Sequence, residues 1–190
     1  MDEIPFKLAF IGRSALPEAG KCIPRGIESS ILQDFGITHM NDNPSIREAA
    51  PADAAAVQAC VEAAYSRYIE RIGKPPGPML DDYDAVIRQH TVFVAECEAI
   101  VAVLVLIRTP AGILLDNVAV HPGYQGKGLG KRLIRLAESE ARARGYDKLE
   151  LYTHECMSEN IEMYESLGYT ETQRKREHGY DRVYLQKGLA

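Results

Sequence analysis

The sequence lacks an apolar run long enough to predict a membrane-spanning helix. Its longest apolar stretch is Ile100 to Ile107, whereas a membrane-spanning helix needs about 20 such residues. The chain opens Met1-Asp2-Glu3, where a secretory signal would carry positive charge before a longer apolar segment. The sequence therefore predicts neither a membrane segment nor export.

Paired cysteines and an excess of positive charge are also missing. The four cysteines, Cys22, Cys60, Cys97 and Cys156, form no C-x-x-C pair, so neither a zinc site nor a disulfide framework is indicated. No metal is expected, and a reducing cytoplasm fits best. With 22 Lys and Arg against 27 Asp and Glu, the net charge is −5, which argues against nucleic-acid binding. A small cationic partner is more natural.

A chain of 190 residues predicts one main domain with a sizeable core. Residues 1–43 show no sustained period, whereas the chain from Ser45 alternates between strand and helix patterns. We therefore place a boundary near Asn43-Pro44, with an extension over 1–43 and a domain over 44–190. The extension is either loosely packed or an inaccurate start, or it is an ordered strand or lid.

The domain reads as a mixed α/β (α+β) sheet flanked by helices. The helix predicted from Asp53, its proposed N-cap, ends before a proline-rich stretch at 74–78, and the helix predicted from Gly128 ends with Gly145 at the C′ position. The predicted strands are 46–49, 91–97, 100–108, 113–120, 148–153, 170–176 and 180–186, and the predicted helices are 53–70, 81–89, 128–144 and 159–167.

The most informative segment is the glycine-rich loop between the strand at 113–120 and the helix at 128–144. Free backbone N–H groups converge there, at the positive end of the helix dipole. Glycine lets the backbone approach phosphate oxygens, and Lys127, Lys131, Arg132 and Arg135 add positive charge. The pattern is that of a pyrophosphate cradle. The alternative is a turn that only connects strand to helix.

The spacing of the glycines and lysines does not match either of two common phosphate-binding loops. A Walker loop needs Ser or Thr after Gly-Lys, but Gly128 and Arg132 follow the two Gly-Lys pairs. A dinucleotide fingerprint begun at Gly126 or Gly128 needs a third glycine where Lys131 or Leu133 stands.

The register that fits is Gln125-x-x-Gly128-x-Gly130, which resembles the acetyl-CoA pyrophosphate signature of the GNAT N-acetyltransferase superfamily. The segment 46–53 is similar to the family's first strand and helix start, and 160–169 is similar to its closing helix and strand. The resemblance implies a GNAT-like sheet with a splayed strand at the cleft, and acetyl-CoA as cosubstrate. It implies cofactor contacts from Val118, Ala119, Val120, Gln125, Gly126, Lys127, Gly128, Leu129, Gly130 and Lys131.

The resemblance also implies that Tyr164 donates a proton to the departing CoA thiolate; the alternative is a core aromatic residue. The family often has Asn seven residues before this tyrosine, but Met157 stands there and Asn160 falls four before it. Asn160 is therefore either a CoA contact or a residue of the helix N-terminus or surface.

A lysine-like amine, with a pKa near ~10.4, must lose a proton before it attacks a thioester. Asp116 alternates with Val118 and Val120 on the strand entering the loop and so could face the cleft as the base. The alternative is a solvated or hydrogen-bonded strand aspartate. Asn117 would face the other way if the strand is regular. His121 and His154 fit turn or surface positions better than catalysis.

Tyr65 and Tyr68 lie three residues apart on one predicted helix, followed by Asp81, Asp82 and Asp84. Together they could line a site for a cationic amine. The alternative is a packed helix face and a solvated acidic turn.

These patterns predict an enzyme that transfers acetyl from acetyl-CoA to a primary amine by direct attack in a ternary complex. Backbone N–H groups near Val118–Val120 would stabilise the oxyanion, and no cysteine occupies a position for a covalent intermediate. The rival is a non-catalytic CoA-binding or regulatory module. The sequence leaves open whether the acceptor is a small molecule, a peptide N-terminus or a protein lysine, and whether the protein forms a homodimer.

Overall fold

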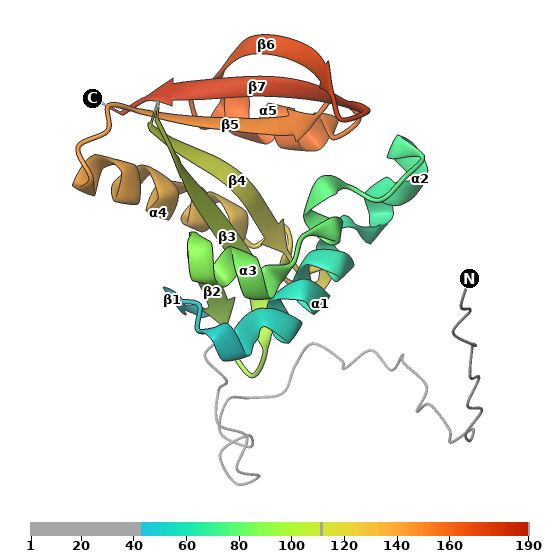
Figure 1. Ribbon diagram of the computed structural model, residues 1–190, viewed down its shortest axis with the longest axis vertical. Helices are drawn as coiled ribbons and strands as arrows, with labels where there is room; N and C mark the ends of the chain where they lie inside the picture. The colour runs from blue at the N-terminus through green and yellow to red at the C-terminus, as the bar shows by residue number, and fades with distance from the viewer. Residues whose placement is uncertain (1–42, 111, 190) are drawn as a thin grey trace, which may run out of the picture. The chain divides into compact units, whose positions relative to one another are not determined.

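A computed structural model describes residues 43–110 and 112–189 of the chain (Figure 1). The predicted extension over 1–43 lies outside the described residues apart from Asn43. Within the described part, no helix is long and apolar enough to cross a membrane, and no group of three or more His, Cys, Asp or Glu side chains is placed to hold a metal ion. Cys60, Cys97 and Cys156 are free thiols.

The elements alternate between strand and helix as the sequence predicts. The strands are β1 (Ser45–Glu48), β2 (Thr91–Glu96), β3 (Ile100–Thr109), β4 (Gly112–Val120), β5 (Lys148–His154), β6 (Thr170–Glu177) and β7 (Tyr180–Gly188). The α-helices are α1 (Ala54–Tyr65), α2 (Ile69–Ile72), α3 (Tyr83–Gln89), α4 (Leu129–Ala143) and α5 (Ser158–Ser166). Short 3₁₀ helices are η2 (Pro51–Asp53), η3 (Ser66–Tyr68), η4 (Gly77–Leu80) and η5 (Pro122–Tyr124).

The seven strands form one sheet in the order β1-β2-β3-β4-β5-β7-β6. The β4–β5 pair is parallel, and every other neighbouring pair is antiparallel. The chain crosses between β4 and β5 through α4, because parallel neighbours need a long connection. The mixed sheet with flanking helices is therefore confirmed.

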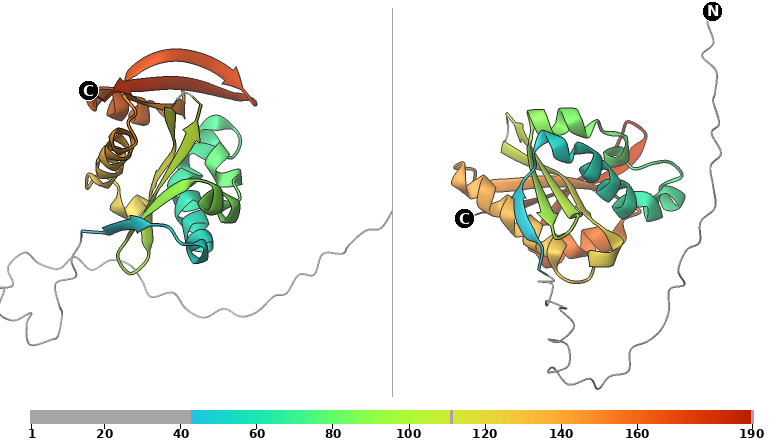
Figure 2. Two further views of the ribbon diagram at one scale, coloured as in Figure 1. Left: turned by 60° about the vertical axis from the view of Figure 1, so that its left-hand side comes forward. Right: turned by 90° about the horizontal axis from the view of Figure 1, so that it is seen from below.

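Helices cover both faces of the sheet (Figure 2). On one face, α1 and α3 pack through a core that contains Val57, Val61, Val103 and Tyr83. On the other face, α4 and α5 pack through a larger core built on Leu104, Leu115, Leu133, Leu151 and Tyr164. Because both faces are covered, β3 is an almost continuous apolar run, and its residues from Ile100 to Leu106 are all buried.

Two helix starts differ in detail from the prediction. Asp53 makes no side-chain cap of α1; instead its carboxylate accepts hydrogen bonds from the Ala50 N–H at 2.7 Å and from the Arg47 guanidinium. Asp53 therefore occupies the predicted N-cap position of α1, but its carboxylate pairs with Arg47 on β1 and does not cap the helix. The predicted helix over 81–89 begins at Tyr83, and Asp82 caps it by accepting from two backbone N–H groups.

The long helix predicted over 53–70 is also interrupted. It tightens into the 3₁₀ helix η3 at Ser66–Tyr68 and resumes as the short α2, which ends at Gly73 with φ of 79°. The predicted helix end at Gly145, which has φ of 80°, is confirmed. The last hairpin turns at His178-Gly179, as predicted, with both residues at positive φ.

Candidate active site

A β-bulge at Asp116 opens the sheet. Leu106 of β3 pairs with Leu115 of β4, and Val105 pairs with Asn117, so Asp116 has no partner on β3. β4 pairs with β5 only over Ile113–Leu115. Beyond that point β4 stays with β3 while β5 pairs with β7, and the two strands diverge (Figure 1). Within the described residues, no strand covers this edge of β4 at 116–120.

The bulge changes the alternation that the sequence suggests. Val118 and Val120 pack toward the α4–α5 core, the same side as Leu115, whereas Ala119 lies in the α1–α3 core. Asn117 does face away from Val118, as expected. However, Asp116 does not alternate regularly with Val118, because one extra residue in β4 separates the two halves of the strand. The predicted regular alternation of Asp116 with Val118 is therefore wrong, because the sequence pattern does not reveal the bulge.

The loop after β4 turns into α4 through residues that leave backbone N–H groups free. His121 caps η5 by accepting from the Gly123 N–H at 3.3 Å. Gly126 and Gly128 have φ of 75° and 82°, a conformation that costs glycine little, and Gly128 is the N-cap of α4. The first-turn N–H groups of α4 therefore point into the space beside the loop.

A groove of about 410 Å³ runs along this loop. Nearly all the residues predicted to hold the cofactor line it, namely Val118, Ala119, Val120, Gln125, Gly126, Gly128, Leu129, Gly130, Lys131 and Asn160. Lys127 does not line it: its ammonium lies 5.1 Å from the Tyr124 ring centroid, beside a further cavity that also contains Arg132. Arg132 is engaged there, since it donates to the Asn43 side chain and the Pro44 carbonyl.

Side chains from α1, η3 and α5 form the opposite wall of the groove. The Gln125 amide donates to the Val120 carbonyl at 2.8 Å and accepts from Arg67 at 3.3 Å. Arg67 also donates to the carboxylate of Glu159 on α5. Arg71 Nη1 donates to both oxygens of the same carboxylate at 3.0 Å. Tyr68, 5% exposed, lies beneath the Arg67 guanidinium at 4.7 Å and lines this groove.

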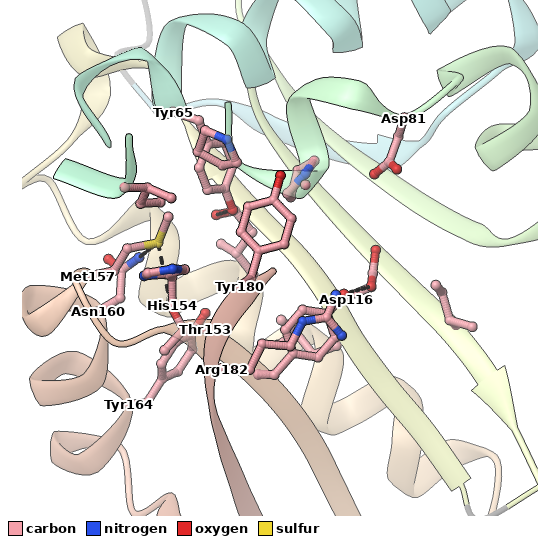
Figure 3. A pocket seen from close by; sticks show the side chains of 18 of the residues that line it. Tyr65, Asp81, Asp116, Thr153, His154, Met157, Asn160, Tyr164, Tyr180 and Arg182 are labelled. Atoms are coloured by element: carbon pink, nitrogen blue, oxygen red, sulfur yellow. Dashed lines mark hydrogen bonds between the residues drawn. The ribbon is translucent and has the colours of Figure 1, made fainter. Parts of the chain in front are cut away.

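A second cavity, of about 320 Å³, lies where β4 and β5 diverge (Figure 3). Tyr65, Val118 and Asn160 line both this cavity and the groove, so the two spaces meet at these residues. In Figure 3, Asp81 and Asp116 lie at one end of the cavity, and Tyr164 and Asn160 lie at the other. Tyr65 and Tyr180 lie between them.

Tyr164 projects from α5 into the second cavity. Its side chain is 6% exposed and its ring meets that of Tyr169 edge-on, with centroids 5.8 Å apart. Its hydroxyl makes no hydrogen bond with the described residues. Burial raises the pKa of this phenol well above its usual value. Tyr164 thus presents a protonated, unpaired donor to the cavity.

Asp116 lies in the same cavity, and its Oδ1 accepts a hydrogen bond from the Tyr152 hydroxyl at 2.8 Å. Burial, followed by the negative charge of Asp116, raises the pKa of Tyr152. Tyr152 is therefore a neutral donor that orients the carboxylate without neutralising it.

A chain of hydrogen bonds connects both walls of the second cavity through a buried amide. The Tyr65 hydroxyl donates to Asn117 Oδ1 at 2.8 Å, and Asn117 Nδ2 donates to the Tyr83 hydroxyl at 2.9 Å. Tyr83 donates in turn to the Pro78 carbonyl at 3.0 Å. Asn117 is 2% exposed, so this chain fixes α1, β4, α3 and η4 relative to one another.

The predicted acceptor residues come together only in part. Tyr65 and Asp81 line the second cavity, whereas Tyr68 lies in the groove. Asp82 caps α3, and Asp84 pairs with Arg88 at 2.9 Å. Tyr152, Tyr180 and Arg182 also line the cavity, from β5 and β7. No sequence pattern pointed to these three residues.

His154 also lines the second cavity, and burial lowers its pKa. Its ring nitrogens lie 3.2 Å and 3.4 Å from the backbone nitrogens of Cys156 and Asp181. His121 stays in the turn, outside both cavities.

Comparison with known proteins agrees with this geometry. Residues 88–171 match the family model described as the Acetyltransferase (GNAT) domain. The chain is 38% identical over 64 residues to the [ribosomal protein bS18]-alanine N-acetyltransferase of Escherichia coli, covering 34% of this chain and 43% of that protein. The chain spans less than half the length of the curated relatives it matches.

Solved structures share the fold. The ribosomal-protein-S18-alanine N-acetyltransferase of Escherichia coli superposes with a TM-score of 0.62 at 20% identity, covering 77% of this chain and 94% of that one. An acetyltransferase of Bacillus subtilis in complex with CoA gives 0.62 at 21% identity, covering 77% and 99%. Residues 88–171 are therefore similar to the GNAT acetyltransferase family, and the chain shares the fold of these acetyltransferases, as the motif at Gln125–Gly130 implies.

Proposed function

We propose that the protein is an acetyltransferase that uses acetyl-CoA as cosubstrate and transfers the acetyl group to a primary amine by direct attack in a ternary complex. One observation carries the proposal: a groove built on a glycine-rich loop meets a side-chain-lined cavity at Tyr65, Val118 and Asn160. Two reactants can therefore bind separately and react where the spaces join.

Acetyl-CoA supplies an activated acetyl thioester. Loop residues Gln125 to Lys131 offer backbone N–H groups and a lysine to its pyrophosphate. The exposed edge of β4 at Val118–Val120 offers backbone groups to the pantetheine and to the developing oxyanion. The acetyl group then reaches the junction of the two spaces.

Tyr164 is the proposed proton donor to the thiolate. In water a thiol with pKa ~8.5 and a phenol with pKa ~10 differ by about 2 kcal/mol, so the transfer is only slightly uphill. Burial raises the pKa of Tyr164, but a thiolate leaving into the same cavity is desolvated too and becomes more basic. The two effects oppose each other, and the transfer stays feasible.

Asp116 is the proposed proton acceptor. A carboxylate cannot deprotonate a free ammonium in advance, because their pKa values differ by about 6 units. The attacking species is the neutral fraction of the amine, whose extra proton has gone to solvent. Its nitrogen becomes acidic as its bond to the acetyl carbon forms, and Asp116 then receives this second proton, directly or through water. Tyr152 holds the carboxylate in place for this step.

We further propose that residues 44–190 form the acetyltransferase domain, that 1–43 are an extension to it, and that the protein works in the cytoplasm. Every residue assigned a role above lies after Asn43.

The test is release of CoA thiol from acetyl-CoA, followed with and without added amines. We expect release that depends on the amine and matches the acetylated product mole for mole. Binding of acetyl-CoA without amine-dependent release from a broad panel would favour the rival, a CoA-binding module that does not turn over.

A further inference from the structure

We propose that the acceptor is a small alkyl molecule with a second ammonium group beside the amine that is acetylated, and that Asp81 recognises that second charge. The inference rests on the proposed acetyl transfer and specifies its substrate class.

The charges that face the second cavity are unbalanced. Asp81, Asp116 and Arg182 line it, together with the imidazoles of His90 and His154. Arg182 already pairs with Glu177 at 3.4 Å and stacks on Tyr152 at 4.1 Å. Asp116 has the neutral Tyr152 hydroxyl as its partner. Asp81 makes no hydrogen bond or ion pair with the described residues, so the carboxylates exceed the available cations.

The two carboxylates act on one another. Partial burial, and then the charge of Asp116, raises the pKa of Asp81. Two carboxylates in this relation are stabilised when a cation binds between or beside them. The rings of Tyr65, Tyr152 and Tyr180 also line the cavity, and aromatic faces attract alkylammonium groups.

The cavity has two chemically different ends. Tyr164, with its unpaired hydroxyl and 6% exposure, lies at the end near Asn160 (Figure 3). Asp81 and Asp116 lie at the other end. Asp116 precedes Val118 by two residues of β4, a rise of at most about 7 Å. An amine that reacts near Val118 and passes its proton toward Asp116 can therefore place a second ammonium, a few methylene groups away, beside Asp81.

A bridge across the rim favours a small acceptor over a polypeptide. The Tyr180 hydroxyl donates to the Pro75 carbonyl at 2.7 Å, so the last hairpin meets the loop after α2. The Lys74 ammonium lies 3.5 Å from the Tyr180 ring centroid and donates to the His178 carbonyl at 3.4 Å. The cavity volume of about 320 Å³ is at the small end of the range for ligand pockets. The bridge and this small volume leave little room for a polypeptide acceptor.

Diaminobutane and butylamine test the proposal, because they differ mainly in the distal ammonium. We expect kcat/KM to be higher for the diamine by about fivefold to tenfold, mostly through KM, as for a partly exposed ion pair. Asp81→Asn should remove this preference. Asp84→Asn is the matched control: it makes the same charge change, but Asp84 pairs with Arg88 and does not line the cavity.

Equal kcat/KM for the two amines, or a preference that survives Asp81→Asn, would overturn the inference and leave acetyl transfer standing. So would a higher kcat/KM for an alanine-led peptide than for the diamine. If no amine releases thiol, the proposed function fails instead. Calorimetry on the CoA-loaded protein then decides the inference separately: tighter binding of diaminobutane than of butylamine, lost in Asp81→Asn, supports it, and equal or absent binding refutes it.

Discussion

The groove along the glycine-rich loop and the cavity beside it are adjacent but built in different ways. Most of the residues that line the groove come from one continuous segment, 118–131, which includes three glycines of the loop. The cavity is lined by residues from α1, α2, η4, α3, β3, β4, β5, α5 and β7. A site that recognises its ligand through backbone is encoded locally, whereas a side-chain pocket exists only once distant elements have packed.

The same contrast separates the two tasks of an acetyltransferase. The groove uses helix-terminal N–H groups, which suit any pyrophosphate. The cavity presents a particular set of carboxylates and rings, which we propose selects one class of acceptor. Changes in the groove should therefore affect acetyl-CoA binding, and changes in the cavity should affect turnover and amine binding.

The largest effect should come from Tyr164→Phe, in the cavity at the end near Asn160. Phenylalanine keeps the packing on Tyr169 but deletes the hydroxyl, so we expect kcat to fall by about 10²–10⁴ while the Kd for acetyl-CoA stays nearly the same. Tyr169→Phe is the control, since that hydroxyl lies outside both cavities. Equal kcat in wild type and Tyr164→Phe would show that Tyr164 is not the proton donor to the thiolate.

Next in size is Gly128→Val, in the groove. Acetyl-CoA at ~100 times its Kd should stabilise the native protein by about 2.7 kcal/mol, visible as a rise in Tm, and the variant should lose this rise. Gly128 has φ of 82° and no atom within 4 Å of an added Cβ, so valine distorts the loop through its backbone rather than through a clash.

Gly145→Val matches this change, because Gly145 has φ of 80° and equally open surroundings at the end of α4. It should lower the unliganded Tm to a similar extent but keep the rise with acetyl-CoA. A full rise in a folded Gly128→Val protein would exclude the loop as the cofactor site.

A smaller effect is expected from Asn117→Ala, which breaks the hydrogen-bond chain of the cavity wall. Loss of the buried amide should lower the free energy of unfolding by about 1–3 kcal/mol, measured by urea denaturation. The amine KM should rise, because Tyr83 and η4 lose their link to β4. An equal loss of acetyl-CoA affinity would show that groove and cavity are not separable.

The fold and the groove could be predicted because their signals are local. Alternation marks β5, where Leu149, Leu151 and Thr153 are buried on one side, and the glycine spacing marks the loop. Gly126 and Gly128 need positive φ at their own positions, so their role depends on no distant residue.

The cavity could not be predicted to the same extent. The bulge at Asp116 is set by pairing with β3, and the partnership of Asn117 with Tyr65 and Tyr83 spans 52 and 34 residues of chain. Nothing in the sequence around Tyr152 or Tyr180 indicates that the divergence of β4 and β5 opens a space beside them. The side chain of Asp53 could not be placed from the local sequence either, because its carboxylate pairs with Arg47 of β1 instead of capping α1.

Initial rates measured with acetyl-CoA and the amine varied together test direct transfer in a ternary complex most directly. The proposed mechanism predicts reciprocal plots that intersect, and no acetyl label on the protein when it is incubated with acetyl-labelled acetyl-CoA alone. Parallel plots, with label retained on the protein after denaturation, would contradict it and require a covalent acetyl-enzyme.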